Sequence, residues 1–338
     1  MVHISLISAR SRLPRLGSEP RIVDLFAGAG LLSHAFASAG FALERAIEVN
    51  AKAAATYALN LGNDIECSDI RHVQPEGRCD VLIAGPPCQG FSTLGKRDQS
   101  DPRNRLSMYV VRWAEALRPK IVVIENVAAF LNAPIWKLLK RRLKRAGYEV
   151  SGAAYNAADF GVPQLRMRSF TFATLGKMPT PLPTAVAPRT VREAWEGLPA
   201  DPDGHNFHYA PKPTEIALRR MRLISPGGDR RDVMARCPEL APPSWWRPRS
   251  EITDVWGRMV WDRPSNTLRT ALQNPSKGRY IHPEQHRVIS LREAARLHSI
   301  PDEWQFVGEP YPIAEQIGNS VPPLLGMAVA RAVRQALG

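Results

Sequence analysis

Ile22-Val23-Asp24-Leu25-Phe26-Ala27-Gly28-Ala29-Gly30 is the stretch on which the fold depends, because a short apolar run ends there in two closely spaced glycines. A second apolar stretch, Leu31 to Ala39, follows directly. This order predicts a strand, a glycine turn and a helix. Glycine permits positive φ and lets a ligand approach the backbone closely, and the start of a helix offers unpaired N–H groups. The turn indicates a ligand site, although a purely structural turn fits the pattern equally well.

The residues after the turn narrow the choice of ligand. Leu31-Leu32-Ser33 follows Gly30, so the G-x-G-x-x-G fingerprint is not met, which argues against a dinucleotide cofactor. Glu48 ends the next apolar run about 20 residues further on, where an acid can accept hydrogen bonds from ribose hydroxyls. Asp69 ends a later segment and is expected to face an adenine. The alternative for both acids is a solvated strand end.

Further apolar runs that end in polar residues lie at 46–48, 80–84 and 121–125, and helical patterns lie between them at 51–61 and 106–117. Strands that alternate with helices predict an α/β fold with a mostly parallel, Rossmann-like sheet covered on both faces. The carboxyl ends of such strands form the edge where ligands bind.

The composition divides the chain. Residues 1–20 are basic and irregular and are interpreted as an arm, and 21–175 form the α/β domain. Residues 176–265, within a domain expected at 176–280, are rich in Pro, Arg and Trp, and the prolines exclude long helices and central strands. A smaller, loop-rich domain is expected there, with Trp245 and Trp246 in a small core. Helical spacing returns near residue 290, so 281–338 are expected to rejoin the first domain.

The charge permits a polyanion partner. The 338 residues contain 45 Lys and Arg against 32 Asp and Glu, a net charge of +13. Charge alone leaves a nucleic-acid partner and no such partner equally open. Four cysteines in a chain of this length indicate a reducing compartment, and no apolar run approaches the roughly 20 residues that span a membrane, so a cytoplasmic location is expected.

Cys88 is the candidate nucleophile. It follows the buried run at 81–84 and the pair Pro86-Pro87, which fixes the backbone before the thiol. The spacing of Cys67, Cys79 and Cys88 contains no C-x-x-C pair, so no metal site is expected. A buried structural thiol is the alternative for Cys88, and it is the preferred interpretation of Cys67 and Cys79.

Two further motifs complete the candidate site. Glu125 ends the run at 121–124, and it lies beside Cys88 if the two strands are neighbours. Arg166 and Arg168 are two residues apart, so on a strand their guanidinium groups share one face. A nucleophile, an acid and paired cations make a catalytic constellation, although surface ion pairs explain each piece alone.

Together these motifs resemble those of the DNA cytosine-5 methyltransferase family, in the same order from about Arg21 to the C-terminus. The resemblance rests on the stretch at 24–30, on Gly85-Pro86-Pro87-Cys88-Gln89-Gly90-Phe91-Ser92, on Glu125-Asn126-Val127, on Gln164-Leu165-Arg166-Met167-Arg168, on 292–297 and on Gln316-Ile317-Gly318-Asn319-Ser320. His298 departs from the Gln that the family more often has. The resemblance implies that 21–175 and 281–338 are catalytic and cofactor-binding, and that 176–280 recognise the target.

The resemblance also implies the reaction. S-adenosylmethionine would supply a methyl group to C5 of a flipped-out cytosine in a specific double-stranded DNA sequence, leaving S-adenosylhomocysteine and requiring no metal. Cys88 would attack C6, Glu125 would protonate or hydrogen-bond N3, and Arg166, supported by Arg168, would hold the O2 edge. The cofactor contacts would be Phe26, Gly28, Gly30, Glu48, Asp69, Ile70, Pro87, Leu106, Asn319 and Ser320.

DNA contacts are expected from the loop after the nucleophile, at Ser92, Lys96, Arg97 and Arg103, with ordinary solvated side chains as the alternative. Base readers are expected among the following residues, with phosphate contact as the alternative role: Arg219, Arg220, Arg222, Arg230, Arg231 and Lys277. The family implies a bacterial, nucleoid-associated monomer with no membrane. It is expected to be either the methyltransferase of a restriction-modification system, with a cognate restriction endonuclease as a candidate partner, or an orphan enzyme. The rival functions are methylation of tRNA at cytosine C5 and DNA binding by a catalytically silent relative.

Overall fold

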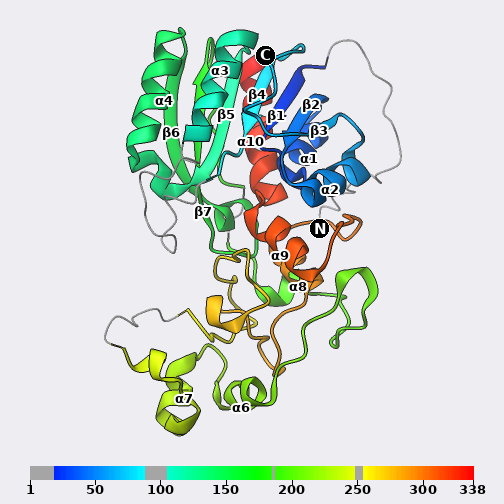
Figure 1. Cartoon of the computed structure of the whole chain (residues 1–338), viewed down its shortest axis with the longest axis vertical. Helices are drawn as coiled ribbons and strands as arrows, with labels where there is room; N and C mark the ends of the chain where they lie inside the picture. Colours follow the sequence, from blue (N-terminus) through cyan, green and yellow to red (C-terminus); the bar gives the residue numbers. More distant parts are fainter. Residues whose placement is uncertain (1–18, 88–104, 185–186, 248–253) are drawn as a thin grey trace. The chain divides into compact units, whose positions relative to one another are not determined.

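The computed structural model describes residues 19–87, 105–184, 187–247 and 254–338, which fall into two compact units (Figure 1). The larger unit comprises the chain up to Phe160, Met167–Val186 and Ser320–Gly338. The smaller unit comprises Gly161–Arg166 and Ala187–Asn319. The chain therefore leaves the larger unit and returns to it twice.

A seven-stranded sheet with the order β3-β2-β1-β4-β5-β7-β6 forms the centre of the larger unit. The first five strands in that order are parallel, and β7 is antiparallel to both of its neighbours. This arrangement confirms the predicted α/β class with a mostly parallel sheet. The strands are β1 (Arg21–Leu25), β2 (Ala42–Glu48), β3 (Ile65–Cys67), β4 (Val81–Ala84), β5 (Ile121–Val127), β6 (Glu149–Asn156) and β7 (Met167–Thr174).

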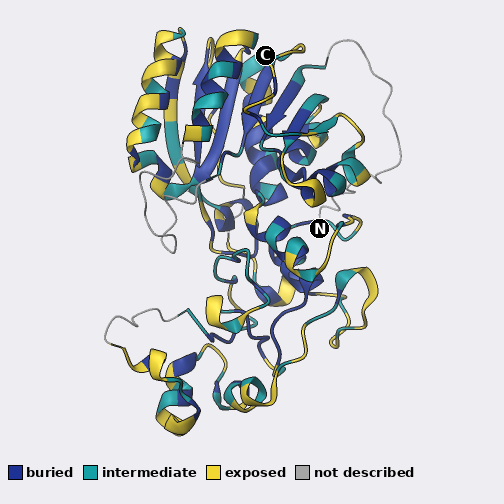
Figure 2. Ribbon diagram, in the orientation of Figure 1, coloured by how far each residue is buried: buried dark blue, intermediate teal, exposed yellow. Residues whose placement is uncertain are grey.

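Helices cover both faces of the sheet because its central strands are apolar on both sides (Figure 2). On one face, Val23 and Val122 pack in one cluster with Val110 of α3 and Leu139 of α4. On the other face, α1 packs against α10 and is tied to β1 by a hydrogen bond from Ser33 to Asp24. The helices are α1 (Leu31–Ser38), α2 (Ala51–Leu61), α3 (Ser107–Leu117), α4 (Pro134–Arg145) and α10 (Pro323–Leu337).

The smaller unit is built from short helices and loops, as its prolines predict. Buried arginine side chains donate to backbone carbonyls that are not paired in a sheet. Arg258, for example, donates to the carbonyls of Met221, Ile224 and His282. Trp245 lies in the small core as expected, but Trp246 is 54% exposed, so that part of the prediction is wrong. The helices are α5 (Val191–Ala194), α6 (Glu215–Leu223), α7 (Arg230–Arg236), α8 (Leu291–Leu297) and α9 (Pro310–Asn319).

Within the described residues, no helix is both long and apolar enough to cross a membrane.

Candidate active site

The glycine turn joins β1 to α1 and shows two different uses of glycine. Gly28 and Gly30 both have positive φ, at 57° and 90°. A Cβ at Gly30 would lie 2.7 Å from the ring of Tyr57, so this glycine is needed for packing against α2. A Cβ at Gly28 would meet no described atom within 4 Å, so the backbone of Gly28 is open to a ligand. Phe26, between strand and turn, also has positive φ.

Glu48 is held at the end of β2 by the turn itself. Its Oε2 accepts a hydrogen bond of 2.8 Å from the N–H of Gly28, and its Oε1 accepts one of 2.7 Å from the N–H of Asn50. Each carboxylate oxygen retains lone-pair capacity for a further donor. The carboxylate is therefore fixed beside the open glycine backbone in an orientation that suits a pair of hydroxyls.

Asp69 and Ile70 lie beyond the end of β3. The carboxylate of Asp69 accepts hydrogen bonds from the guanidinium and then from the backbone N–H of Arg71, and these lower its pKa to about 2. The side chain of Ile70 is buried in the core, so only its backbone is available to a ligand. The apolar side chain of Val49 is 66% exposed directly after Glu48, which the sequence reasoning missed. A β-branched apolar residue after a strand-ending acid was the signal that could have identified it.

The nucleophile loop begins at the carboxyl end of β4, and its first residues are anchored. The N–H of Gly85 donates to the carbonyl of Leu25, and the side-chain amide of Asn126 donates to the carbonyl of Pro86 at 3.1 Å. Pro87 is partly buried. Cys88 and the predicted DNA contacts Ser92, Lys96, Arg97 and Arg103 lie outside the described residues.

Glu125 lies on β5, next to β4 in the sheet, as the sequence interpretation required. Only 8% of the residue is exposed. A Cβ at Gly85 would be 3.8 Å from Glu125 Oε2, so the carboxylate is beside the loop three residues before Cys88. Arg168 Nε lies 3.0 Å from Glu125 Oε1, and both side chains are largely buried. A shielded acid and guanidinium therefore face the start of the nucleophile loop.

The two arginines do not share a strand face, contrary to the expectation from their spacing. The strand β7 begins at Met167, so Arg168 is on it and Arg166 precedes it. Arg166 is fully buried in the smaller unit, where it donates to the carbonyls of Leu268 (2.8 Å) and Gly318 (2.6 Å). The guanidinium of Arg168 is the one that contacts Glu125.

The remaining predicted residues are less closely grouped. Leu106 precedes α3 and packs against the core cluster of the larger unit. Asn319 ends α9 and is exposed, and Ser320 follows it. Among the proposed base readers, Arg219, Arg222 and Lys277 are exposed, whereas Arg230 is buried. Arg231 pairs with Asp229, and Arg220 lies over the rings of Trp245 and Trp256.

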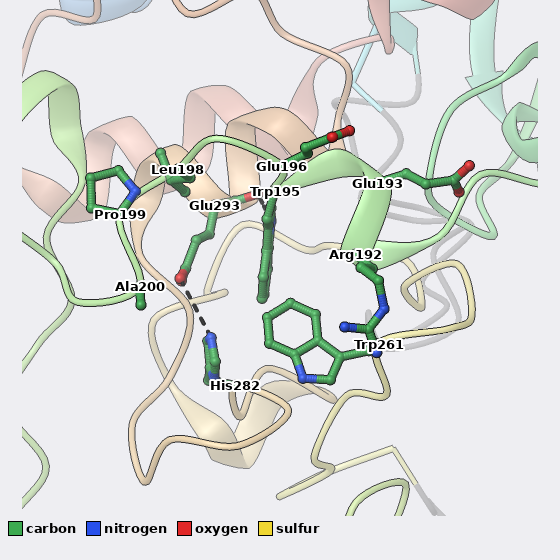
Figure 3. Close-up of a pocket in the computed structure, with 10 residues that line it drawn as sticks. All are labelled: Arg192, Glu193, Trp195, Glu196, Leu198, Pro199, Ala200, Trp261, His282 and Glu293. Carbon is green, nitrogen blue, oxygen red and sulfur yellow. Dashed lines mark hydrogen bonds and ion pairs between the residues drawn. The ribbon is translucent and has the colours of Figure 1, made fainter.

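The smaller unit also contains a pocket of about 440 Å³ (Figure 3). Trp195 stacks on His282 with ring centroids 5.3 Å apart, and Trp261 meets both rings edge-on. Glu293, 3.8 Å from His282 Nε2, is neutralised by two hydrogen bonds from Arg287. Because these polar groups already have protein partners, the pocket is best explained as part of the packing of the unit. Glu125, Arg166 and Arg168, the predicted catalytic residues that the structure describes, do not line it.

Across the described parts of the chain, no cluster of three or more His, Cys, Asp or Glu side chains is arranged to hold a metal ion.

Comparison with known proteins gives a consistent result. A family profile described as C-5 cytosine-specific DNA methylase matches residues 20–335. Type II methyltransferase M1.HphI of Haemophilus parahaemolyticus is 35% identical over 333 residues, covering 92% of this chain and 86% of that protein. Type II methylase M.HgiDII of Herpetosiphon aurantiacus is 29% identical over an alignment that covers 94% of this chain and 95% of that protein.

Solved structures share the fold. A prophage-encoded E. coli protein described as a DNA modification methyltransferase superimposes with a TM-score of 0.75 at 24% identity, covering 94% of this chain and 99% of its own. The S. pombe Dnmt2 methyltransferase superimposes with a TM-score of 0.65 at 16% identity, covering 94% of this chain and 98% of its own.

Proposed function

Since this chain belongs to the C-5 cytosine-specific DNA methylase family, whose members use S-adenosylmethionine, we propose that it methylates a flipped-out cytosine in a specific duplex sequence through a covalent adduct at Cys88. The observation that carries the proposal is the pairing of Glu125 with Arg168 beside Gly85, at the start of the loop that bears Cys88. An acid and a guanidinium at that point suit a ring that takes up negative charge after attack by a thiolate.

The proposed sequence of steps starts at Cys88. Its thiolate bonds to C6 of the cytosine, and the electron pair of the C5–C6 double bond moves so that C5 becomes nucleophilic. Glu125 supplies a proton or a strong hydrogen bond to N3, which receives the developing charge. C5 takes the methyl group, which is the chemistry that bound S-adenosylmethionine supplies. Loss of the C5 proton to a base then expels the thiolate and restores the double bond.

Arg168 is the arginine that we place at the O2 edge of the base. Its Nε contacts Glu125 Oε1 at 3.0 Å, so the guanidinium lies beside the acid that is proposed to act at N3, and O2 is the ring oxygen next to N3. Arg166 supports the site indirectly, because it connects Leu268 with Gly318, the residue before Asn319. This assignment exchanges the roles that the family resemblance implies for the two arginines.

The cofactor fits the end of β1 and β2. The open backbone at Gly28 and the oriented carboxylate of Glu48 suit the amino-acid portion and the ribose hydroxyls, and exposed Val49 offers an apolar surface to the adenine. Asp69, Ile70, Pro87, Leu106, Asn319 and Ser320 complete the proposed contacts.

Glu48→Gln is expected to weaken S-adenosylmethionine binding about 10- to 100-fold, because a hydrogen bond to a charged acceptor contributes about 1.5–3 kcal/mol. Titration calorimetry measures the dissociation constant directly. The matched control is Glu44→Gln on the same strand, whose carboxylate pairs with Arg21 and is given no role with the cofactor. Equal affinities of Glu48→Gln and the wild type would contradict the ribose assignment.

The relatives that are named Type II methyltransferases indicate the biological setting. We propose that the protein is the methyltransferase of a Type II restriction-modification system, acting as a monomer on the bacterial nucleoid and protecting the sequence that a cognate endonuclease would cut. Residues 176–280 are proposed to recognise that sequence.

The deciding experiment is transfer of tritiated methyl groups from S-adenosylmethionine to duplex DNA of mixed sequence, with tRNA as the competing acceptor. Label is expected in DNA alone, and bisulfite sequencing then gives the methylated context. Duplexes with 5-fluorocytosine at that position should trap the wild type covalently, because fluorine replaces the C5 proton whose loss would expel the thiolate. They should not trap Cys88→Ala. Label in tRNA alone would overturn the DNA proposal, and label without a trapped adduct would overturn the covalent one.

A further inference from the structure

The helix α4 presents a row of cations that the proposed reaction does not use. Its 12 residues contain six Lys and Arg and no acid. Leu139 and Leu143 are buried and fix which side of the helix faces the sheet. The opposite side carries Lys137, Arg141, Lys144 and Arg145, all of which are exposed, and Figure 2 shows this exposed side along α4. We refer to these four residues as the α4 basic stripe.

Neighbouring side chains do not neutralise the α4 basic stripe. Among the described residues, no member of the stripe forms an ion pair, whereas the adjacent Arg142 pairs with Glu115 at 3.2 Å. Lys140 lies over the ring of Trp136 at 4.8 Å, which covers that ring and leaves it unavailable for stacking on a base. The stripe therefore offers charge, with no aromatic surface.

Helix stability alone does not account for the stripe. Cations in the last turn favour the helix C-terminus, which explains Lys144 and Arg145. Lys137 and Arg141 lie further back, and the pairs Lys137/Arg141 and Arg141/Arg145 are like charges at i, i+4, each costing about 0.2–0.5 kcal/mol. Exposed cations that repel one another and thereby lower the stability of the helix indicate a partner of opposite charge.

The geometry fits the phosphate backbone of DNA. With a rise of 1.5 Å per residue, the stripe extends for about 12 Å along the helix. Duplex DNA carries one charge per about 1.7 Å of its axis, so several phosphates fall within that length. The helix follows β5 after the short turn η2 (Ala128–Asn132), and therefore starts at the edge of the sheet where Glu125 lies. A duplex whose target base is held at that edge would meet the stripe with its flanking part, because the stripe continues along α4 away from the edge.

We propose that the α4 basic stripe binds the phosphate backbone of duplex DNA outside the recognition sequence, on the same molecule that carries the target cytosine. This inference rests on the proposed function and adds a second, sequence-independent DNA contact to it. The contact would strengthen binding to long DNA without contributing to methyl transfer itself.

The test compares K137Q/R141Q/K144Q with R78Q/K177Q/R331Q, a control that removes three exposed cations elsewhere in the larger unit. Both variants lose the same net charge, and Gln preserves helix propensity. Binding is measured over a salt series on a duplex that just covers the recognition sequence and on one extended by several helical turns on each side. The turnover number is measured on the short duplex.

For the stripe variant, the slope of log affinity against log salt on the long duplex should fall by about 2–3, since each phosphate contact contributes about 0.9. Its binding to the short duplex and its turnover should match those of the control. Equal salt slopes for the two variants would overturn the proposal, and so would a loss of affinity for the short duplex as large as that for the long one. The proposal would also be overturned if the stripe variant lost affinity only for a second DNA molecule that is not joined to the duplex carrying the target. Failure of the wild type to methylate any DNA would instead refute the proposed function.

Discussion

Arg168→Lys is expected to reduce the turnover number about 10²–10³-fold, the cost typical of removing one preorganised donor from a developing charge, while the melting temperature stays close to that of the wild type. Lysine keeps the positive charge beside Glu125, so the largely buried ion pair is not broken outright. It lacks the planar fork with which a guanidinium can contact a carboxylate and a ring oxygen together. The substitution should therefore lower the turnover number and leave the melting temperature nearly unchanged.

Arg166→Lys is the matched comparison and should show the reverse pattern. A lysine cannot donate to the carbonyls of Leu268 and Gly318 in the geometry that Arg166 uses, and a buried acceptor without a donor costs about 1–3 kcal/mol. The melting temperature should fall, whereas the turnover number should remain near the wild-type value at temperatures where the variant is folded. A large rate defect of a fully stable Arg166→Lys would place Arg166 at the base instead.

The contrast between these arginines marks the limit of what the sequence could predict. The strand, glycine turn and helix at 22–39 followed from local pattern, because apolar periodicity and glycine act within a few residues. The sequence placed Glu125 at the nucleophile loop on the condition that its strand and the strand before Cys88 are neighbours, and the pairing of β4 with β5 meets that condition. The alternation of strands and helices predicts the parallel sheet but does not by itself give the order of its strands.

Other features depend on contacts between distant parts of the chain. The spacing of Arg166 and Arg168 suggests one shared face, but the strand begins between them and the boundary of the two units falls at the same point. Burial of Arg166 depends on carbonyls more than 100 residues away in sequence. Exposure of Trp246 beside buried Trp245 likewise depends on the packing of the smaller unit, which proline-rich sequence does not specify.

Asp24→Asn, on β1 just before the glycine turn, is expected to abolish a large part of the pH dependence of stability. Asp24 is 2% exposed, and burial raises the pKa of its carboxyl from 3.8 to about 7, with the nearby charge of Glu48 acting in the same direction. The folded state therefore holds a proton that the unfolded state releases near pH 4. The stability that this proton contributes is fully present below about pH 4 and is lost as the pH rises through 7.

The magnitude follows from the difference between the two pKa values. At 1.36 kcal/mol per pKa unit, the stability lost between pH 4 and 8 is about 4 kcal/mol. Asparagine does not titrate, so the free energy of unfolding of Asp24→Asn minus that of the wild type should rise by about this amount over the same range. Urea unfolding at a series of pH values measures the difference, in which titrations common to both proteins cancel. A difference independent of pH would contradict the prediction.

Ser33→Ala distinguishes the buried carboxyl from a general effect of the turn. Ser33 Oγ donates to Asp24 Oδ2 at 2.7 Å and accepts from the hydroxyl of Tyr57 at 3.2 Å. Burial raises the pKa of Tyr57, so its hydroxyl remains a donor throughout the range. The Ser33 hydrogen bond lowers the pKa of Asp24 because it favours the charged form. Removal of this hydrogen bond should raise the pKa of Asp24 further, so the pH-dependent loss of stability should become larger and extend to higher pH. Asp24→Asn should instead abolish that loss. Because both side chains flank the turn beside Gly28, the same pH range should govern the affinity for S-adenosylmethionine if the turn must stay fixed to bind it.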